Sequence, residues 1–158
     1  MPRIYTVTLP ATAIAAPMDI FQIKGAAGKT LKIKRLQLTD VDTVLPTAQM
    51  LDLRGRFLPA TVTDGSAGGT STPAKADPGD AAASFTCLNA NTSKATTNGT
   101  AVTVAVPGCH IYAGLDHVFQ PGTEPIIGPS ESFVFEMLST PSGTCTFQAT
   151  VTVEETGG

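Results

Sequence analysis

The chain has 158 residues, the length of a single domain with a sizeable core, so one domain spanning residues 1–158 is expected. Its formal net charge of −3 gives no overall attraction to nucleic acid or to an anionic membrane, so neither is an expected partner. Charged residues make up only 15% of the sequence, against roughly 25% in an average globular chain. A surface with so few charges is more typical of a protein that its neighbours largely cover.

The cysteines and the N-terminal residues indicate the cellular compartment in which the protein folds. Cys87, Cys109 and Cys145 are widely spaced and form no CxxC pair, so we expect buried free thiols rather than a disulfide framework or a zinc site. No stretch of the sequence is apolar over transmembrane length. Residues 4–9 alternate like a strand, with polar Thr6 and Thr8, which argues against a signal peptide. We therefore expect a protein that is made and folded in a reducing cytoplasm.

Alternating and apolar runs predict four strands in the N-terminal part of the chain, at residues 3–9, 18–24, 30–40 and 49–57. The first strand is expected to end at Pro10. In the third, the apolar side chains change parity half-way along, which predicts a bulge near Lys34 and Arg35. In the fourth, Gly55 predicts a bend or a close approach of another segment.

Residues 59–83 differ in kind, because they are rich in Gly, Pro, Ser and Ala and have no usable periodicity. A connection of this length inside a compact domain is either functional or disordered, and it is too short to link two domains. We interpret it as an extended loop or arm, with a turn at Asp77-Pro78-Gly79-Asp80. Deleting residues 65–77 is then expected to leave the β-domain folded.

The rest of the chain predicts strands at residues 84–90, 101–106, 109–113 and 115–119, with Asn98-Gly99 as the turn of a hairpin. The runs at residues 132–139 and 144–154 are joined through Pro141 and Gly143, and we interpret them as a long β-hairpin that forms the floor of the domain. Strict alternation in the second run predicts one dry face and one wet face. With no convincing amphipathic helix, these elements favour an all-β sandwich or barrel.

No catalytic, cofactor-binding or metal-binding residue is predicted. The end of a phosphate-binding loop is superficially similar to Gly25-Ala-Ala-Gly28-Lys29-Thr30. However, the motif needs a glycine where Ile23 stands, and it needs a helix where a β pattern follows. The only histidines, His110 and His117, lack the spacing of metal ligands, and no nucleophile elbow is present. We therefore expect a protein that is not an enzyme and has no cofactor.

Half of the ten basic residues lie in one short stretch, at Lys24, Lys29, Lys32, Lys34 and Arg35. On a strand, Lys32 and Lys34 point the same way and form a small positive patch. One interpretation is an edge strand that lysine protects from aggregation. The other is docking onto an acidic protein surface, where charge steers and registers the partner. No aromatic residues interleave with these lysines, which weakens a nucleic-acid interpretation.

One diffuse pattern extends over most of the chain and includes residues 20–24, 31–39, 73–85, 99–104, 138–141 and 151–155. In this pattern the chain resembles the small capsid decoration, or cement, proteins of tailed bacteriophages. The resemblance implies a non-enzymatic protein with a jelly-roll-like antiparallel β-sandwich of about eight to ten strands. It also implies a virion location, where dimers or trimers bind the outside of an assembled capsid and staple adjacent subunits of the major capsid protein.

We hypothesise that the arm and the basic stretch carry the contacts to the capsid and to neighbouring copies. A pliant arm can become ordered on binding, and weak contacts add up over an array. The candidate partner-binding residues are Lys24, Lys29, Lys32, Lys34, Arg35, Thr63, Asp64, Thr70, Thr72, Pro73, Lys75 and Asp77.

Two other functions stay open. One is a receptor- or glycan-binding module of a phage fibre or spike, which ranks second because the sequence has no Trp and only Tyr5 and Tyr112 as tyrosines to stack on sugars. The other is a cupin-like metalloenzyme, which needs more histidine and carboxylate ligands than two histidines supply.

Overall fold

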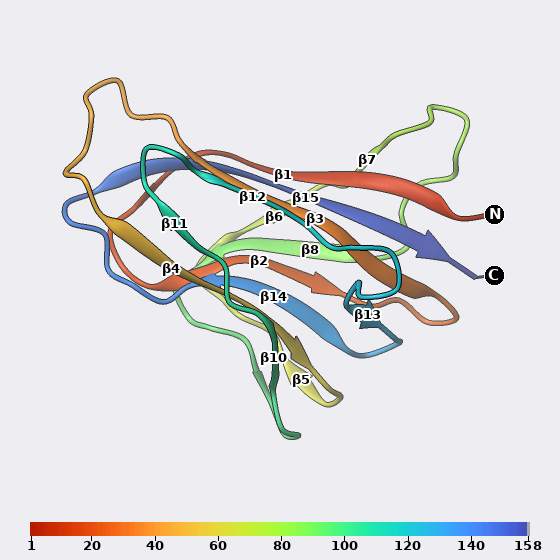
Figure 1. The fold of residues 1–158 in the computed structure, drawn as a ribbon. Coiled ribbons are helices and arrows are strands. Elements are labelled where there is room, and N and C mark those ends of the chain that lie inside the picture. Colours follow the sequence, from red (N-terminus) through yellow and green to blue (C-terminus); the bar gives the residue numbers. More distant parts are fainter. Residues whose placement is uncertain (158) are drawn as a thin grey trace.

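The computed structural model describes residues 1–157, which form a sandwich of two large antiparallel sheets (Figure 1). This part of the chain contains no helix, and therefore none that could span a membrane. The all-β sandwich that the sequence predicts is confirmed. Within residues 1–157, nine strands have at least four residues, in line with the prediction, and six shorter strands add edges and an outer layer.

One large sheet, here sheet A, has six strands in the order β12-β3-β15-β1-β7, with β13 also paired to β3. Its long central strands alternate buried apolar and outward polar side chains, as a sheet with one wet face requires. The strands are β1 (Arg3–Ile14), β3 (Thr30–Asp40), β7 (Ala74–Lys75), β12 (Leu115–Val118), β13 (Ile126–Ile127) and β15 (Cys145–Thr156).

The second sheet, sheet B, has seven strands in the order β10-β4-β14-β2-β8-β6, with β11 also paired to β4. Its central strands β14 and β2 are buried on both faces except at the last residue of β2. The strands are β2 (Met18–Lys24), β4 (Met50–Leu58), β6 (Gly69–Ser71), β8 (Thr86–Asn91), β10 (Val102–Ala105), β11 (Gly108–His110) and β14 (Ser132–Met137).

A small third layer explains why sheet B is buried on its outer face. Strands β5 (Val62–Thr63) and β9 (Thr96–Thr97) pair with each other, and Ser66 forms an isolated bridge with Ser93. Val62 and Ala95 pack against Val134, on the face of β14 that points away from the main core. We call residues 59–66 and 92–98 the cover, which lies beneath sheet B in Figure 1.

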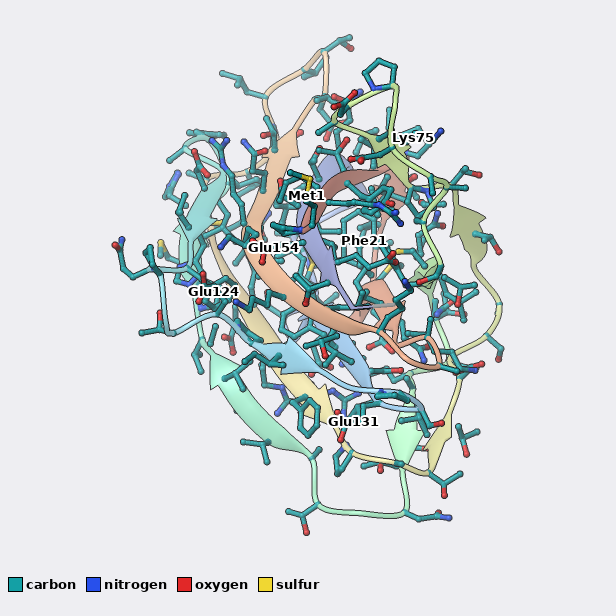
Figure 2. All side chains as sticks on the ribbon, turned by 90° about the vertical axis from the view of Figure 1, so that its right-hand side faces the viewer. Met1, Phe21, Lys75, Glu124, Glu131 and Glu154 are labelled. Carbon is teal, nitrogen blue, oxygen red and sulfur yellow. The ribbon has the colours of Figure 1, made fainter. Side chains whose placement is uncertain are left out.

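The main core fills the space between the two sheets. Sheet B contributes large side chains such as Phe21 and Phe133, and sheet A contributes Phe147, all of which are fully buried. Figure 2 shows Phe21 in the interior, whereas Lys75 and Glu124 lie on opposite flanks of the molecule.

Three local predictions are confirmed. Thr152 pairs with Arg35 and Val153 with Ile33, so Lys34 is the extra residue of a bulge in β3. A Cβ atom on Gly55 would lie 3.0 Å from Phe133 Cζ, so this glycine allows a close approach. The three cysteines are free and buried.

The predicted C-terminal hairpin is wrong. Strand β14 pairs with β2 and β4 in sheet B, whereas β15 pairs with β1 and β3 in sheet A. The connection at residues 138–144 therefore crosses from one sheet to the other. The cause lies in burial: β14 is covered on both faces and β15 on one, so the two strands belong to different layers.

Two turn predictions are also wrong. Asn98-Gly99 does not join a hairpin of β8 and β10, because the chain between these strands passes through the cover and β10 pairs with β4 instead. Strand β1 does not end at Pro10, but continues to Ile14 after a register shift between Leu9 and Thr12. A bulge is one of the few places where a strand tolerates proline.

Residues 59–83 do not project as an arm. Strand β6 extends sheet B beside β8, and β7 extends sheet A beside β1, so residues 69–75 run along one flank of the sandwich and join its two sheets. Ser71 Oγ donates a hydrogen bond to the Thr8 carbonyl (2.8 Å), and Tyr5 Oη donates one to the Ala81 carbonyl (3.0 Å). Backbone hydrogen bonds to β8 and β1 therefore order this segment, although its sequence shows no alternation of apolar and polar side chains.

Candidate functional site

The predicted basic stretch is divided among several ion pairs. Lys24 Nζ lies 2.6 Å from Asp64 Oδ2, so the structure brings together two residues that were predicted from separate segments. Lys29 Nζ donates a hydrogen bond to the Gly157 carbonyl at 2.6 Å, at the other end of the chain. Each of these lysines therefore ties one segment of the chain to another.

Lys32 and Lys34 do share one face, but carboxylates neutralise both. Lys34 Nζ lies 2.6 Å from Glu124 Oε1 and 3.4 Å from Glu154 Oε2, and Lys32 Nζ lies 3.8 Å from Glu154 Oε1. The Lys34 ammonium, together with the backbone N–H groups of Glu124 and Gly122, lowers the pKa of the Glu124 carboxyl to about 2. The same hydrogen bond raises the pKa of Lys34.

Arg35 is also neutralised within the chain, because it forms a bidentate ion pair with Asp116. Its Nε and Nη2 atoms donate to Oδ1 and Oδ2 at 2.6 and 2.5 Å, and this contact lowers the pKa of the Asp116 carboxyl. The basic stretch is thus not a free positive patch. Nor does it protect an edge, because β3 lies inside sheet A between β12 and β15.

The candidate residues of the 59–83 segment do not gather in one place. Thr63 and Asp64 lie in or beside β5 in the cover. The others follow the flank: Thr70 in β6, Thr72 and Pro73 between the strands, Lys75 in β7, and Asp77 in the next turn. Asp77 Oδ1 accepts a hydrogen bond from the Gly79 N–H (2.8 Å), so the predicted turn is confirmed.

The outer face of sheet A carries an array of uncharged polar side chains. The register pairs Thr39 with Gln148, Gln37 with Thr150 and Thr150 with Thr8, and it pairs Thr152 with Thr6. We call this surface the threonine–glutamine face; its members are Thr6, Thr8, Gln37, Thr39, Gln148, Thr150 and Thr152. It occupies three neighbouring central strands, and the ion pairs of Lys32, Lys34 and Arg35 lie at one end of it.

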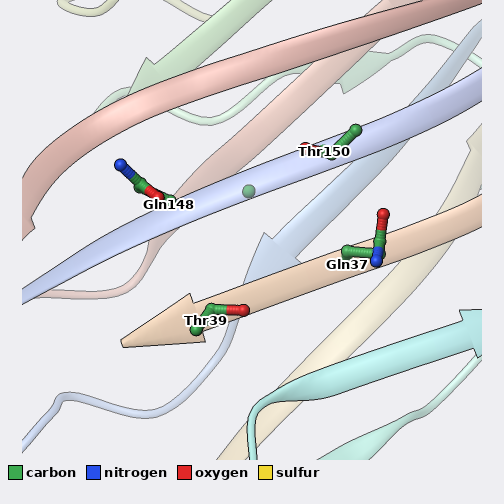
Figure 3. Close-up of a pocket in the computed structure, with 5 residues that line it drawn as sticks. Gln37, Thr39, Gln148 and Thr150 are labelled. Carbon is green, nitrogen blue, oxygen red and sulfur yellow. The ribbon is translucent and has the colours of Figure 1, made fainter. Parts of the chain in front are cut away.

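A shallow hollow of about 190 Å³ lies in this face, among Gln37, Thr39, Gln148, Ala149 and Thr150. Figure 3 shows the four polar side chains on the neighbouring strands β3 and β15. Pockets that bind drug-sized ligands usually have about 300–1,000 Å³, so the hollow is small for a buried ligand. Its hydroxyl and amide groups can both donate and accept hydrogen bonds.

The second chemical feature is an acid–base cluster buried between sheet B and the cover. The Glu136 carboxylate lies 2.6 Å from Arg54 Nε, 2.9 Å from Arg56 Nε and 2.8 Å from Lys94 Nζ. Asp19, directly across the strand pair from Glu136, accepts a hydrogen bond from the Ala95 N–H at 2.7 Å. We call Asp19, Arg54, Arg56, Lys94 and Glu136 the buried ion cluster.

The two carboxyl groups of this cluster respond differently to their surroundings. Burial raises the pKa of Asp19 to about 6, although the Ala95 N–H and the Arg56 guanidinium act against it. One Asp19 oxygen, Oδ1, has no hydrogen-bond partner and lies 3.9 Å from Arg56 Nη2. Burial also opposes ionisation of Glu136, but the hydrogen bonds from Arg54 and Lys94 outweigh it and lower the pKa of that group.

Both carboxyl side chains are fully buried, so the buried ion cluster connects elements rather than facing a substrate. It joins β2, β4 and β14 to the cover through Lys94 and Ala95. The sequence analysis missed it, although a signal was present: Asp19 and Glu136 are charged residues inside otherwise apolar runs, and a buried charge needs a partner.

In the part of the chain that the structure describes, no group of three or more potential metal ligands gathers around the histidines or elsewhere. His110 packs edge-on against Tyr112, with ring centroids 5.0 Å apart, and His117 packs in the same way against Phe119. Both rings therefore serve as packing groups beside the β11–β12 connection.

No family model, curated protein or solved structure matches this chain.

Proposed function

We propose that this chain is a structural protein that binds the outer surface of an assembled bacteriophage capsid through its threonine–glutamine face, without catalysing a reaction. The observation that carries the proposal is the uncharged polar face on the three central strands of sheet A. The resemblance to capsid decoration proteins points to the same class of partner, the major capsid protein.

The chemistry of the face suits contact with another folded protein. Threonine is stiff at χ1 because it is β-branched, so it loses little conformational freedom when it is covered. Hydroxyl and amide groups offer donors and acceptors without the desolvation cost of a charge. A surface whose hollow is only about 190 Å³ matches a broad partner rather than a small ligand.

The charge distribution supports the same proposal. Lys32, Lys34 and Arg35 are neutralised within the chain, so the partner surface need not be acidic. Each single contact is expected to be weak. Repetition over the many identical subunits of a shell, or linkage of two copies, makes the overall binding strong.

The test is co-sedimentation with assembled shells of the major capsid protein from the same phage. The wild-type chain is expected to move with the shells in a sucrose gradient. Gln148→Lys and Thr8→Lys, both at exposed positions of the face, should each reduce the bound fraction about tenfold, because a lysine ammonium would be desolvated in the contact.

Thr70→Lys is the matched control, since Thr70 is exposed on β6 of sheet B. It should bind like the wild type. The reverse result, with binding lost only in Thr70→Lys, would move the contact to the 59–83 segment. No co-sedimentation of the wild-type chain would refute the capsid partner.

A second candidate function is glycan binding, which the hollow in the face favours. Gln37 and Gln148 place two side-chain amides at its rim, and amides often bind sugar hydroxyl groups. No aromatic side chain lines it for stacking. A glycan array would reveal this function, and Gln37→Ala should then abolish the signal.

A further inference from the structure

Strand β10 forms an open edge of sheet B. It pairs with β4 on one side, and within residues 1–157 no strand lies on its other side. Every second backbone N–H and C=O group of an edge strand points outward without a partner. Such a row of groups can bind another extended strand through main-chain hydrogen bonds.

This edge carries no charged side chain that would oppose pairing. Between Lys94 and Asp116 the sequence has no charged residue. Val102, Val104 and Val106 are 49%, 39% and 66% exposed. The two edges of sheet A, by contrast, carry charged residues: Asp116 in β12 and Lys75 in β7. Natural proteins commonly place charges on edges to prevent association, so their absence from β10 marks an interaction surface.

The sequence of the edge identifies its partner. Ala101-Val-Thr-Val-Ala105 reads the same in both directions about Thr103. Two antiparallel copies related by a two-fold axis therefore place Val102 opposite Val104 and Thr103 opposite the second Thr103. A two-fold interface must be self-complementary, and this segment is. Pairs of β-branched residues across an antiparallel ladder are favourable.

The pairing of β10 with β4 leaves the outer edge of β10 free. Its register shifts between Thr103 and Ala105, so Val104 is displaced from the pairing with β4. Ala105 packs against the core and anchors the strand. Pro107 ends the edge, which limits the paired segment to a few residues.

We infer that β10 pairs antiparallel with β10 of a second copy of this chain, which joins the two B sheets edge to edge in a two-fold symmetric dimer. This pairing needs no capsid, so it goes beyond the proposed function and is tested without one.

The first measurement is the mass in solution, by size-exclusion chromatography with light scattering over a range of concentrations. The wild-type chain should approach twice its 16.2 kDa mass as the concentration rises. Val104→Lys should raise the dissociation constant more than about tenfold, because each lysine would face Val102 of the second copy. Val44→Lys, at a 79% exposed valine in the loop between β3 and β4, should dimerise like the wild type.

The second measurement keeps the inference testable if Val104→Lys does not fold. Residues opposite each other in an antiparallel pair have Cα atoms about 4.5–5.5 Å apart, within the range of a disulfide. Thr103→Cys should therefore give a disulfide-linked dimer on mild oxidation. Thr96→Cys, at an exposed position of β9, should stay monomeric on the same gel.

Two results would overturn the inference. One is a wild-type chain that stays monomeric up to about 1 mM. The other is a dimer that persists in Val104→Lys while Thr103→Cys fails to cross-link, since the interface would then lie elsewhere. If the wild-type chain forms the dimer but does not bind capsids, the proposed function would be refuted and the β10 pairing would stand.

Discussion

At the scale of single residues, the buried ion cluster is the most demanding feature of the molecule. A buried charge is costly unless it is paired, and breaking such a pair by removing one partner is strongly destabilising. Glu136 alone faces Arg54, Arg56 and Lys94. Because Lys94 belongs to the cover and the arginines to β4, this one carboxylate holds two layers together.

Glu136→Gln should therefore lower the free energy of unfolding by about 1.5–3 kcal/mol, because it removes the charge from a buried acceptor while Arg54 and Lys94 stay partly exposed to solvent. Urea unfolding followed by circular dichroism measures this change. Asp116→Asn is the control, since it removes the exposed partner of Arg35 and should change the midpoint little. Equal midpoints for both variants would show that Glu136 does not hold the cover.

The raised pKa of Asp19 predicts that its contribution to the free energy of unfolding falls as the pH rises, whereas that of most carboxylates increases. Its pKa rises from 3.8 to about 6 on folding, so the folded state binds the proton more tightly than the unfolded state. The free energy of unfolding therefore gains from this group at low pH and loses that gain as the pH rises from about 4 to about 6. Relative to Asp19→Asn, the wild type should become less stable over that interval. Above about pH 6, the difference in free energy of unfolding between the two should stay constant.

Glu124 supplies the contrast. Its pKa falls from 4.5 to about 2, so its stabilising contribution is present above pH 4.5 and is lost as the pH falls toward 2. Relative to Glu124→Gln, the wild type should lose its advantage in that acid range. Urea midpoints for both variants across pH 2–7 check the two signs; curves parallel to the wild type throughout would contradict both assignments.

At the scale of elements, residues 59–83 are part of the sandwich. Strand β6 pairs with β8, β7 pairs with β1, and the Gly65 N–H donates a hydrogen bond to Gln22 Oε1 at 2.9 Å. Glycine is required in this segment, because a Cβ atom on Gly68 would lie 2.1 Å from the Asn89 carbonyl oxygen. We therefore no longer expect the β-domain to stay folded when residues 65–77 are deleted.

Replacing residues 69–75 with a glycine–serine linker of equal length should lower the melting temperature clearly. Both edge pairings and the bonds of Ser71 to Thr8 and Asn89 would be lost. Replacing only residues 77–79 should change it little, because Asp77 and Gly79 bond within their own turn. Thermal unfolding followed by circular dichroism compares the two, and equal melting temperatures would mean that the flank strands contribute no stability.

At the scale of the whole molecule, both sheets share one core. Cys87 lies in sheet B and Cys145 in sheet A, and both side chains are completely buried. Burial raises the pKa of both thiols, so neither is reactive until the sandwich opens. The two thiols therefore report separately on the opening of the two sheets.

If the sandwich unfolds as one unit, Cys87 and Cys145 should react with a thiol reagent at the same slow rate, set by global unfolding. Cys109, which is 7% exposed on the short strand β11, should react faster. Mass spectrometry of peptides after timed labelling measures the rates. Clearly different rates for Cys87 and Cys145 would mean that one sheet opens without the other.

Features that depend on side-chain period and local backbone chemistry could be predicted from the amino-acid sequence. The alternation in β15, the parity change at Lys34 and the glycine at position 55 each follow from which face of a strand a side chain occupies. The all-β class and the buried thiols follow from the same kind of pattern. For these features the neighbours along the chain carry the information.

Which strands are neighbours could not be predicted, because it depends on contacts between segments that are distant in the sequence. A strand's pattern states how many of its faces are buried, but not which segment buries them. Strands β14 and β15 therefore looked like a hairpin although they lie in different sheets, and residues 59–83 looked like an arm because their order comes from backbone pairing. The buried ion cluster and the threonine–glutamine face arise in the same way, since each gathers side chains from strands that are distant in the sequence.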